Sequence, residues 1–321
     1  MIKTYVSSNG GLAPMAPDTP LDQALWIDLY RPQPEQVDAV RALGVDVPSL
    51  ADMEEIEISN RLYREGALDY MTIVLPGQTP EGAQIAAPVT LIVGPDRMVT
   101  VRHHAPRPFE TFSARADKSA NGCDVAQEVF LGLTGEIIGR LADLLETSGK
   151  ALDVVGAAVF SVADGRGKRQ SMGAVLARIG AEGEALGRVR LACLTLERAL
   201  SFYAQAREGD GAQRASVAQA VKSLTKDVQS LEVHADYLSS RVGLASDAAL
   251  GMINLEQNAT VRIVSVVAVL FLPPTLIASV YGMNFTHMPE LAQWWGYPMA
   301  VGAMVASAVL TYVFFRWKNW L

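Results

Sequence analysis

The sequence predicts an α+β cytosolic domain, a region of long helices, and two transmembrane helices at the C-terminus. Three observations support this fold class. Short segments of alternating apolar and polar residues fall before residue 124 and are typical of strands. Longer amphipathic patterns follow them and are typical of helices. Residues 263–281 and 297–315 contain no charged side chain, and runs of about 20 apolar residues match the hydrocarbon thickness of a bilayer.

The predicted N-terminal domain, residues 1–123, combines strands with short helices. A helix is expected at residues 34–43, with Pro34 in its first turn. A second helix is expected at residues 49–58, where acidic residues near the N-terminal end complement the helix dipole. Strands are expected at residues 25–29, 70–75, 88–93 and 98–103, with a turn at residues 94–96 between the last two.

Long helices are expected throughout residues 124–260. Amphipathic periodicity predicts helices at residues 125–163 and 170–208, with a Gly-rich break after each. A third helix is expected at residues 215–282, a length of about 68 residues or on the order of 100 Å. Only its last third fits within a bilayer, so the rest is expected to form a cytosolic stalk.

The distribution of basic residues predicts how the chain crosses the membrane. Arg262 precedes the first uncharged run, and Arg316 and Lys318 follow the second, whereas the intervening loop contains no Lys or Arg. Because basic residues favour the cytoplasmic side, both termini are expected in the cytoplasm. The polar start of the chain lacks an apolar leader segment, so the soluble part is expected to stay in the cytosol. The expected order is a first membrane helix at residues 261–284, an extracytoplasmic loop at 285–296, a second membrane helix at 297–315 and a basic tail at 316–321.

Composition excludes some classes of function. The net charge is −7, and residues outside the membrane part carry 24 basic and 33 acidic side chains, a net charge of −9. This balance argues against nucleic acid as a partner. It suits a soluble domain, and it also suits a sensor of divalent cations. The two cysteines, Cys123 and Cys193, lie far apart without CxxC spacing, which indicates two reduced thiols in preference to a disulfide or a zinc site.

Several motifs together resemble one known family. They are WIDL at residues 26–29, EEIEISNRLY at 54–63, GMINLEQN at 251–258, FLPPTLIASVYGMNFTHMPEL at 271–291 and the ending KNWL at 318–321. The chain is similar to CorA-type magnesium/cobalt transporters, which have two membrane helices and a YGMNF signature. The similarity covers nearly the whole chain and is weakest at about residues 78–205. It implies a homopentameric channel of a bacterial inner membrane, with a funnel-shaped cytosolic domain, a pore lined by the first membrane helix, and a second helix that faces lipid.

The resemblance implies that Gly282, Met283 and Asn284 form the outer selectivity filter. The chemistry of the residues supports this role. Five Asn284 side-chain carbonyls would form a ring of oxygen dipoles, and Mg²⁺ loses its water reluctantly, so a neutral ring suits a hydrated ion. Gly282 would end the helix and let the backbone turn close to the axis. The alternative for Asn284 is a helix cap.

A stripe at helical spacing follows the first membrane helix. Its members are Asn258, Val261, Ser265, Ala268, Leu272, Thr275 and Ser279. The resemblance implies that Asn258, Leu272 and Thr275 face the pore axis, although many relatives carry Met where Leu272 stands. Val261 and Leu272 would be apolar constrictions that gate by dewetting, and Thr275 a polar ring. The alternative is ordinary packing between helices. Pro273 and Pro274 remove backbone donors in mid-membrane and indicate a kink or a hinge.

Two further sites are expected to act on cations. Relatives often carry an acidic residue just after the signature, whereas this chain has Thr286 and His287; Glu290 is retained and could attract cations at the outer mouth. His287 is interpreted as an interfacial residue or a ligand for a softer metal.

Asp227 lies close to the position of the family's stalk aspartate, which binds regulatory divalent ions between subunits. The sequence around Asp227 matches the family poorly, and the alternative is a solvated helix face. The nearest acidic patch, Asp52, Glu54, Glu55 and Glu57, is partly explained by the helix dipole.

The predicted function is uptake of Mg²⁺, and also of Co²⁺ and Ni²⁺, through a pore driven by the membrane potential. Intracellular Mg²⁺ bound between subunits is expected to close it, so Mg²⁺ is both transported and regulatory. Neither a nucleotide nor an enzymatic site is expected, because residues 165–168 lack phosphate-loop spacing. The expected partners are further copies of the chain, the lipid bilayer and divalent cations. The alternatives are a ZntB-type Zn²⁺ transporter, which the intact Met283 disfavours, and a non-conducting membrane-anchored sensor or scaffold.

Overall fold

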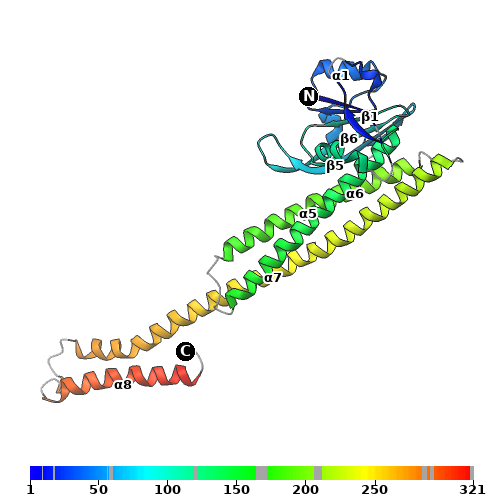
Figure 1. Cartoon of the computed structure of the whole chain (residues 1–321). Coiled ribbons are helices and arrows are strands. Elements are labelled where there is room, and N and C mark those ends of the chain that lie inside the picture. Colours follow the sequence, from blue (N-terminus) through cyan, green and yellow to red (C-terminus); the bar gives the residue numbers. More distant parts are fainter. Residues whose placement is uncertain are drawn as a thin grey trace. The chain divides into compact units, whose positions relative to one another are not determined.

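The computed structural model describes residues 1–8, 10–16, 19–55, 57, 61–118, 122–163, 172–205, 212–283, 288–289 and 293–318 (Figure 1). The chain forms two compact units, Met1–Ser246 and Asp247–Leu321. The first unit contains a mixed sheet and three packed long helices. The second unit contains the last part of the third long helix and the final helix.

The sheet has seven strands in the order β2-β1-β3-β7-β6-β5-β4. The strands are β1 (Ile2–Ser8), β2 (Gly11–Pro14), β3 (Trp26–Tyr30), β4 (Leu62–Glu65), β5 (Leu68–Gln78), β6 (Gln84–Val93) and β7 (Met98–Arg102). Neighbouring strands are antiparallel except β3 and β7, which are parallel. The four predicted strands are confirmed, whereas β1, β2 and β4 were not predicted.

Short helices lie between the strands and between β7 and the first long helix. They are η1 (Leu21–Gln23), α1 (Pro34–Arg41), α2 (Leu50–Glu54), α4 (Pro108–Arg115) and η2 (Ala116–Lys118). The prediction of a helix at residues 49–58 is wrong at its C-terminal end, because the helix stops at Glu54 and the backbone of Glu55 is no longer helical. The Asp52 carboxylate accepts hydrogen bonds from the Ser49 backbone (2.9 Å) and hydroxyl (2.7 Å), and these bonds lower its pKa. The Ser49 hydroxyl in turn accepts from the Asp52 amide at 3.3 Å, so the two residues form a capping box at the start of this helix.

The long helices form as predicted: α5 (Ala126–Ala163), α6 (Met172–Gln205), α7 (Ala212–Tyr281) and α8 (Gly296–Trp317). Apolar residues at alternating spacings of three and four make α5, α6 and the first part of α7 pack together. On α7 this series is Val221, Leu224, Val228, Leu231, Ala235, Leu238 and Val242. Ion pairs border the packed faces, with Arg241 2.7 Å from Asp153 and Arg190 3.2 Å from Asp236.

Helix α6 also closes one edge of the sheet. Strand β5 extends beyond its short partner β4, which pairs only with residues 68–71. The Val74 amide donates to the Thr195 hydroxyl of α6 at 3.0 Å. The next outward-facing position, Pro76, has no amide hydrogen to satisfy. A side chain and a proline thus protect an edge that could otherwise pair with another strand.

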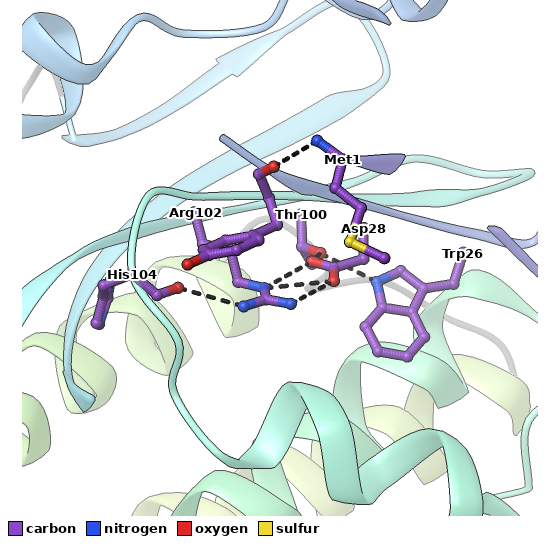
Figure 2. Close-up of polar contacts among 7 residues, drawn as sticks. Met1, Trp26, Asp28, Thr100, Arg102 and His104 are labelled. Carbon is purple, nitrogen blue, oxygen red and sulfur yellow. Dashed lines mark hydrogen bonds and ion pairs between the residues drawn. The ribbon is translucent and has the colours of Figure 1, made fainter. Parts of the chain in front are cut away.

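A buried polar network joins the parallel strands β3 and β7 (Figure 2). Arg102 donates to both carboxylate oxygens of Asp28, at 3.0 and 2.8 Å, and the two side chains are 2% and 1% exposed. The Trp26 indole donates to Thr100, whose hydroxyl donates to Asp28 at 2.9 Å. The guanidinium also lies over the rings of Tyr30 and Phe109 (4.7 and 5.2 Å). The buried charges of Asp28 and Arg102 are thus paired and hydrogen-bonded to each other and to neighbouring groups, as a buried ion pair requires.

Arg102→Met is expected to lower the stability of the chain by about 3–5 kcal/mol, because it leaves the Asp28 carboxylate buried without its cation. Urea unfolding of the purified protein in detergent measures the change. The double variant Asp28→Leu/Arg102→Met is expected to lose less, since no charge stays buried. Arg41→Met is the control: Arg41 pairs with Asp38 at the surface (55% and 71% exposed), and its loss is expected to cost less than about 1 kcal/mol. An Arg102→Met protein as stable as the wild type would contradict the role of the network.

His104 is a buried histidine beside this network. Its Nε2–H donates to the Leu75 carbonyl at 2.9 Å, and its own carbonyl accepts from Arg102 at 3.2 Å. The pKa of His104 is lowered to about 4, chiefly by burial and also by the neighbouring Arg102 charge, against the opposing effect of the Leu75 hydrogen bond. The ring is therefore neutral in the folded protein at neutral pH.

Stability is expected to fall as the pH decreases from about 6.5 to about 4. In this range the unfolded chain binds a proton at His104, whose ordinary pKa is 6.5, whereas the folded chain does not. Melting temperatures at pH 7 and pH 5 measure the effect. His104→Gln is expected to reduce the difference between the two pH values, and the same change at exposed His234 to leave it intact. An unchanged difference in the His104 variant would contradict the assignment.

Candidate ion pathway

The second unit carries the two apolar helices. The segments Ala215–Tyr281 and Gly296–Trp317 each contain an 18-residue window long and apolar enough to cross a membrane, and these windows are only 6% and 11% buried. Helix α8 runs back along the end of α7 within this unit (Figure 1). Exposed apolar surface costs about 25 cal/mol per Å² in water. Lipid or further copies of the chain must therefore cover these helices.

The predicted pathway residues lie on one uninterrupted helix. Asn258, Val261, Leu272 and Thr275 are all exposed on α7, with Val261 64% and Leu272 69% exposed. Successive members are three, eleven and three residues apart, which places them on one side of the helix. No other part of the described chain covers this side, so it is free to face a partner or a pore. The pore-lining role itself stays a prediction.

Two prolines lie inside this helix without ending it. Helix α7 continues through Pro273 and Pro274 to Tyr281. Because proline has no amide hydrogen, the carbonyls of Val269 and Leu270 lose their usual helical donors. One residue further, the Thr275 hydroxyl donates to the Phe271 carbonyl at 2.6 Å. The expected hinge at this position stays a prediction.

Helix α7 ends where the sequence predicts. The Gly282 amide donates to the Ala278 carbonyl at 2.9 Å, and the Met283 amide to the Val280 carbonyl at 3.3 Å. A Cβ atom at residue 282 would lie 3.0 Å from the Ala278 carbonyl oxygen, closer than almost all such contacts, which explains a glycine here.

Met283 is 46% exposed. The remaining residues predicted for the filter and the outer mouth, Asn284, Thr286, His287 and Glu290, lie outside the described residues.

The predicted sensor residue Asp227 lies on the part of α7 in the first unit. Its side chain is exposed, next to buried Val228. Within the described residues it makes no ion pair and no hydrogen bond, and no group of three or more His, Cys, Asp or Glu could hold a metal ion. Within the described residues of a single chain, Asp227 and the acidic patch near Asp52 therefore do not come together as a metal site.

Comparison with known proteins identifies the family. Residues 22–317 match the family described as CorA-like Mg²⁺ transporter protein. The chain belongs to this family. Magnesium transport protein CorA of Mannheimia succiniciproducens is 31% identical, with both chains fully covered. CorA of Pasteurella multocida is 33% identical over 94% of this chain and 93% of its own. Since CorA proteins are transporters, the chain is not an enzyme, as predicted.

Solved structures share the CorA fold. The complete CorA magnesium transporter of Methanocaldococcus jannaschii superposes with a TM-score of 0.78 at 16% identity, over 100% of this chain and 99% of its own. The cytoplasmic domain of ZntB from Vibrio parahaemolyticus superposes with a TM-score of 0.59 at 9% identity, over 78% of this chain and 97% of its own. The fold is therefore common to both branches, and sequence similarity is what relates this chain to CorA.

Sequence reasoning missed a polar cluster on the long helices of the first unit. Glu232 of α7 lies near Glu197 of α6 and Asp236 of α7; burial raises its pKa, and the two neighbouring carboxylates raise it further. Gln229 donates to Glu197 at 2.7 Å. The spacing of four residues between Glu232 and Asp236 was the available signal, but their closeness to Glu197 depends on how the helices pack.

The two cysteines are free, as predicted. Cys123 and Cys193 are both buried. Burial raises the pKa of the Cys123 thiol to about 11 and that of Cys193 to about 12. Both thiols are therefore protonated and unreactive at neutral pH.

Proposed function

We propose that this chain is a channel for Mg²⁺ uptake that also admits Co²⁺ and Ni²⁺. The observation that carries this proposal is full-length similarity of 31% identity to proteins named magnesium transport protein CorA. The two exposed apolar helices and the Gly282-Met283 end of α7 support it. The working assembly is a homopentamer with a funnel-shaped cytosolic part, because two membrane helices from one chain cannot enclose a polar pathway.

The proposed route starts at Gly282, Met283 and Asn284, where Glu290 raises the local cation concentration. Hydrated ions then pass Thr275, Leu272 and Val261, and leave past Asn258 into the cytoplasm. The membrane potential drives this movement, since about 2.3 kcal/mol per charge per 100 mV gives roughly 4.6 kcal/mol for a divalent ion. Both termini are cytoplasmic in the inner membrane. The proposed regions are the N-terminal cytosolic domain (1–123), the long-helix region (124–260), the pore-lining first membrane helix (261–284), the extracytoplasmic loop (285–296), the second membrane helix (297–315) and the basic tail (316–321).

Asn284→Ala is expected to reduce Mg²⁺ influx into proteoliposomes at least tenfold, because it removes the ring of amide oxygens that receives the hydrated ion. Influx under a potassium diffusion potential, followed with an entrapped Mg²⁺ indicator, measures the effect. Gln293→Ala removes an exposed amide from the segment before α8 and serves as the control. Influx through Asn284→Ala at the wild-type rate would contradict the filter assignment.

Cytosolic Mg²⁺ bound by Asp227 between neighbouring chains is proposed to close the pore. Loss of that Mg²⁺ would leave acidic faces to repel each other and loosen the assembly.

Asp227→Asn is therefore expected to keep Mg²⁺ influx high when the vesicle interior on the cytosolic side contains millimolar Mg²⁺, whereas wild-type influx falls. Asp143→Asn, which alters an exposed carboxylate of α5, is the control. Closure that is unchanged in Asp227→Asn would remove Asp227 from the sensor.

A ZntB-type Zn²⁺ transporter is the second candidate, supported by the shared fold of the ZntB cytoplasmic domain. Proton-coupled Zn²⁺ entry with little Mg²⁺ flux would favour it. If the assembled oligomer transports neither Mg²⁺ nor Zn²⁺, the result would favour a non-conducting scaffold.

A further inference from the structure

The hydroxyl of Ser265 is fixed as a hydrogen-bond acceptor toward the outside of α7. Its Oγ–H donates to the Val261 carbonyl of the preceding turn at 2.8 Å. A serine hydroxyl has one hydrogen and two lone pairs. Because the hydrogen is used within the helix, only lone pairs point outward, and the side chain is exposed.

The position of Ser265 relates it to the proposed pathway. It lies seven residues after Asn258 and seven before Leu272, and seven residues are close to two helical turns, so the three share one side of α7. It also lies between Val261 and Leu272, about 6 Å and 10 Å away along the axis at 1.5 Å per residue. These two are the proposed apolar constrictions. Ser265 is thus the polar side chain on this side between them.

The water shell of a divalent cation needs acceptors around it. Water molecules bound to Mg²⁺ turn their oxygens to the ion and their hydrogens outward, so a wall that contacts the shell must accept hydrogen bonds. Water around an anion is oriented the opposite way and needs donors. A hydroxyl that already donates its hydrogen to a carbonyl can accept hydrogen bonds from the water shell of a cation but cannot donate to that of an anion. Donation to the carbonyl also polarises the hydroxyl oxygen, which makes it a better acceptor.

We propose that Ser265 forms a ring of acceptors that holds the water shell of a hydrated divalent cation between the constrictions at Val261 and Leu272. This inference rests on the proposed function. It makes Ser265 a residue that favours hydrated cations over anions, in addition to the filter. The Thr275 hydroxyl is oriented in the same way by the Phe271 carbonyl, at 2.6 Å.

Mg²⁺ influx into proteoliposomes tests the proposal with three variants. Ser265→Ala removes the acceptor and is expected to slow influx about fivefold, the effect of one hydrogen bond of ordinary net strength. Ser265→Thr keeps a hydroxyl that can donate to the preceding turn, and its rate is expected within twofold of the wild type. Thr260→Val is the matched control: Thr260 donates to the Glu256 carbonyl at 3.0 Å, but it lies on the opposite side of α7. Size-exclusion profiles verify that all variants assemble alike.

Each alternative outcome has a distinct meaning. Ser265→Ala at the wild-type rate would overturn the role of Ser265 and leave the proposed function intact. Equal loss in Ser265→Ala and Ser265→Thr would also overturn it, since packing and not acceptance would then limit flux. Absence of Mg²⁺ influx in the wild type would overturn the proposed function and this inference with it.

Discussion

The uncovered apolar surface of α7 is the constraint on which the rest of the molecule depends. Ile263, Val264 and Leu276 are each more than 60% exposed, and no charged residue interrupts residues 263–281. A helix that is apolar on all sides is stable only among lipids or other helices. Contact with lipid or with other helices is therefore required by this one stretch of sequence. Polar side chains on one side of this helix, such as Thr275, are then available to contact ions in the proposed pathway.

The same helix is built differently in the first unit. There its apolar residues occupy only a stripe, from Val221 to Val242, which packs against α5 and α6. The change from a stripe to an all-apolar surface occurs without a break in α7. The ion binding proposed at Asp227 would therefore act on the same helix that carries the proposed pathway, which is the physical reason for proposing a sensor there.

The elements that sequence predicted well are those specified by local pattern. The long helices repeat their apolar spacing over more than 30 residues, and the central strands are rich in β-branched residues. Strands β1 and β4 escaped prediction because they are partly polar, and β1 pairs with β3, more than 20 residues away. The burial of Asp28 was also unpredictable, since it depends on Arg102, 74 residues further along the chain.

In the candidate site, too, local features could be predicted from the sequence and contacts between distant residues could not. The exposed stripe follows from periodicity, and the end of α7 coincides with Gly282, where a Cβ atom would lie 3.0 Å from the Ala278 carbonyl oxygen. The proposed pairing of Asp227 with a carboxylate of another chain would depend on contacts between chains, which no local pattern specifies. Asn284 and Glu290 lie outside the described residues, so their roles rest on family membership and chemistry.

The number of chains in the assembly tests most directly whether α7 lines a shared pathway. Native mass spectrometry of the detergent-purified protein measures it without reference to transport. Five copies per particle are expected, which would cover the apolar helices and enclose a polar route. A monomer or a dimer that is stable across detergent conditions would contradict the pathway, because two or four membrane helices cannot surround a hydrated ion.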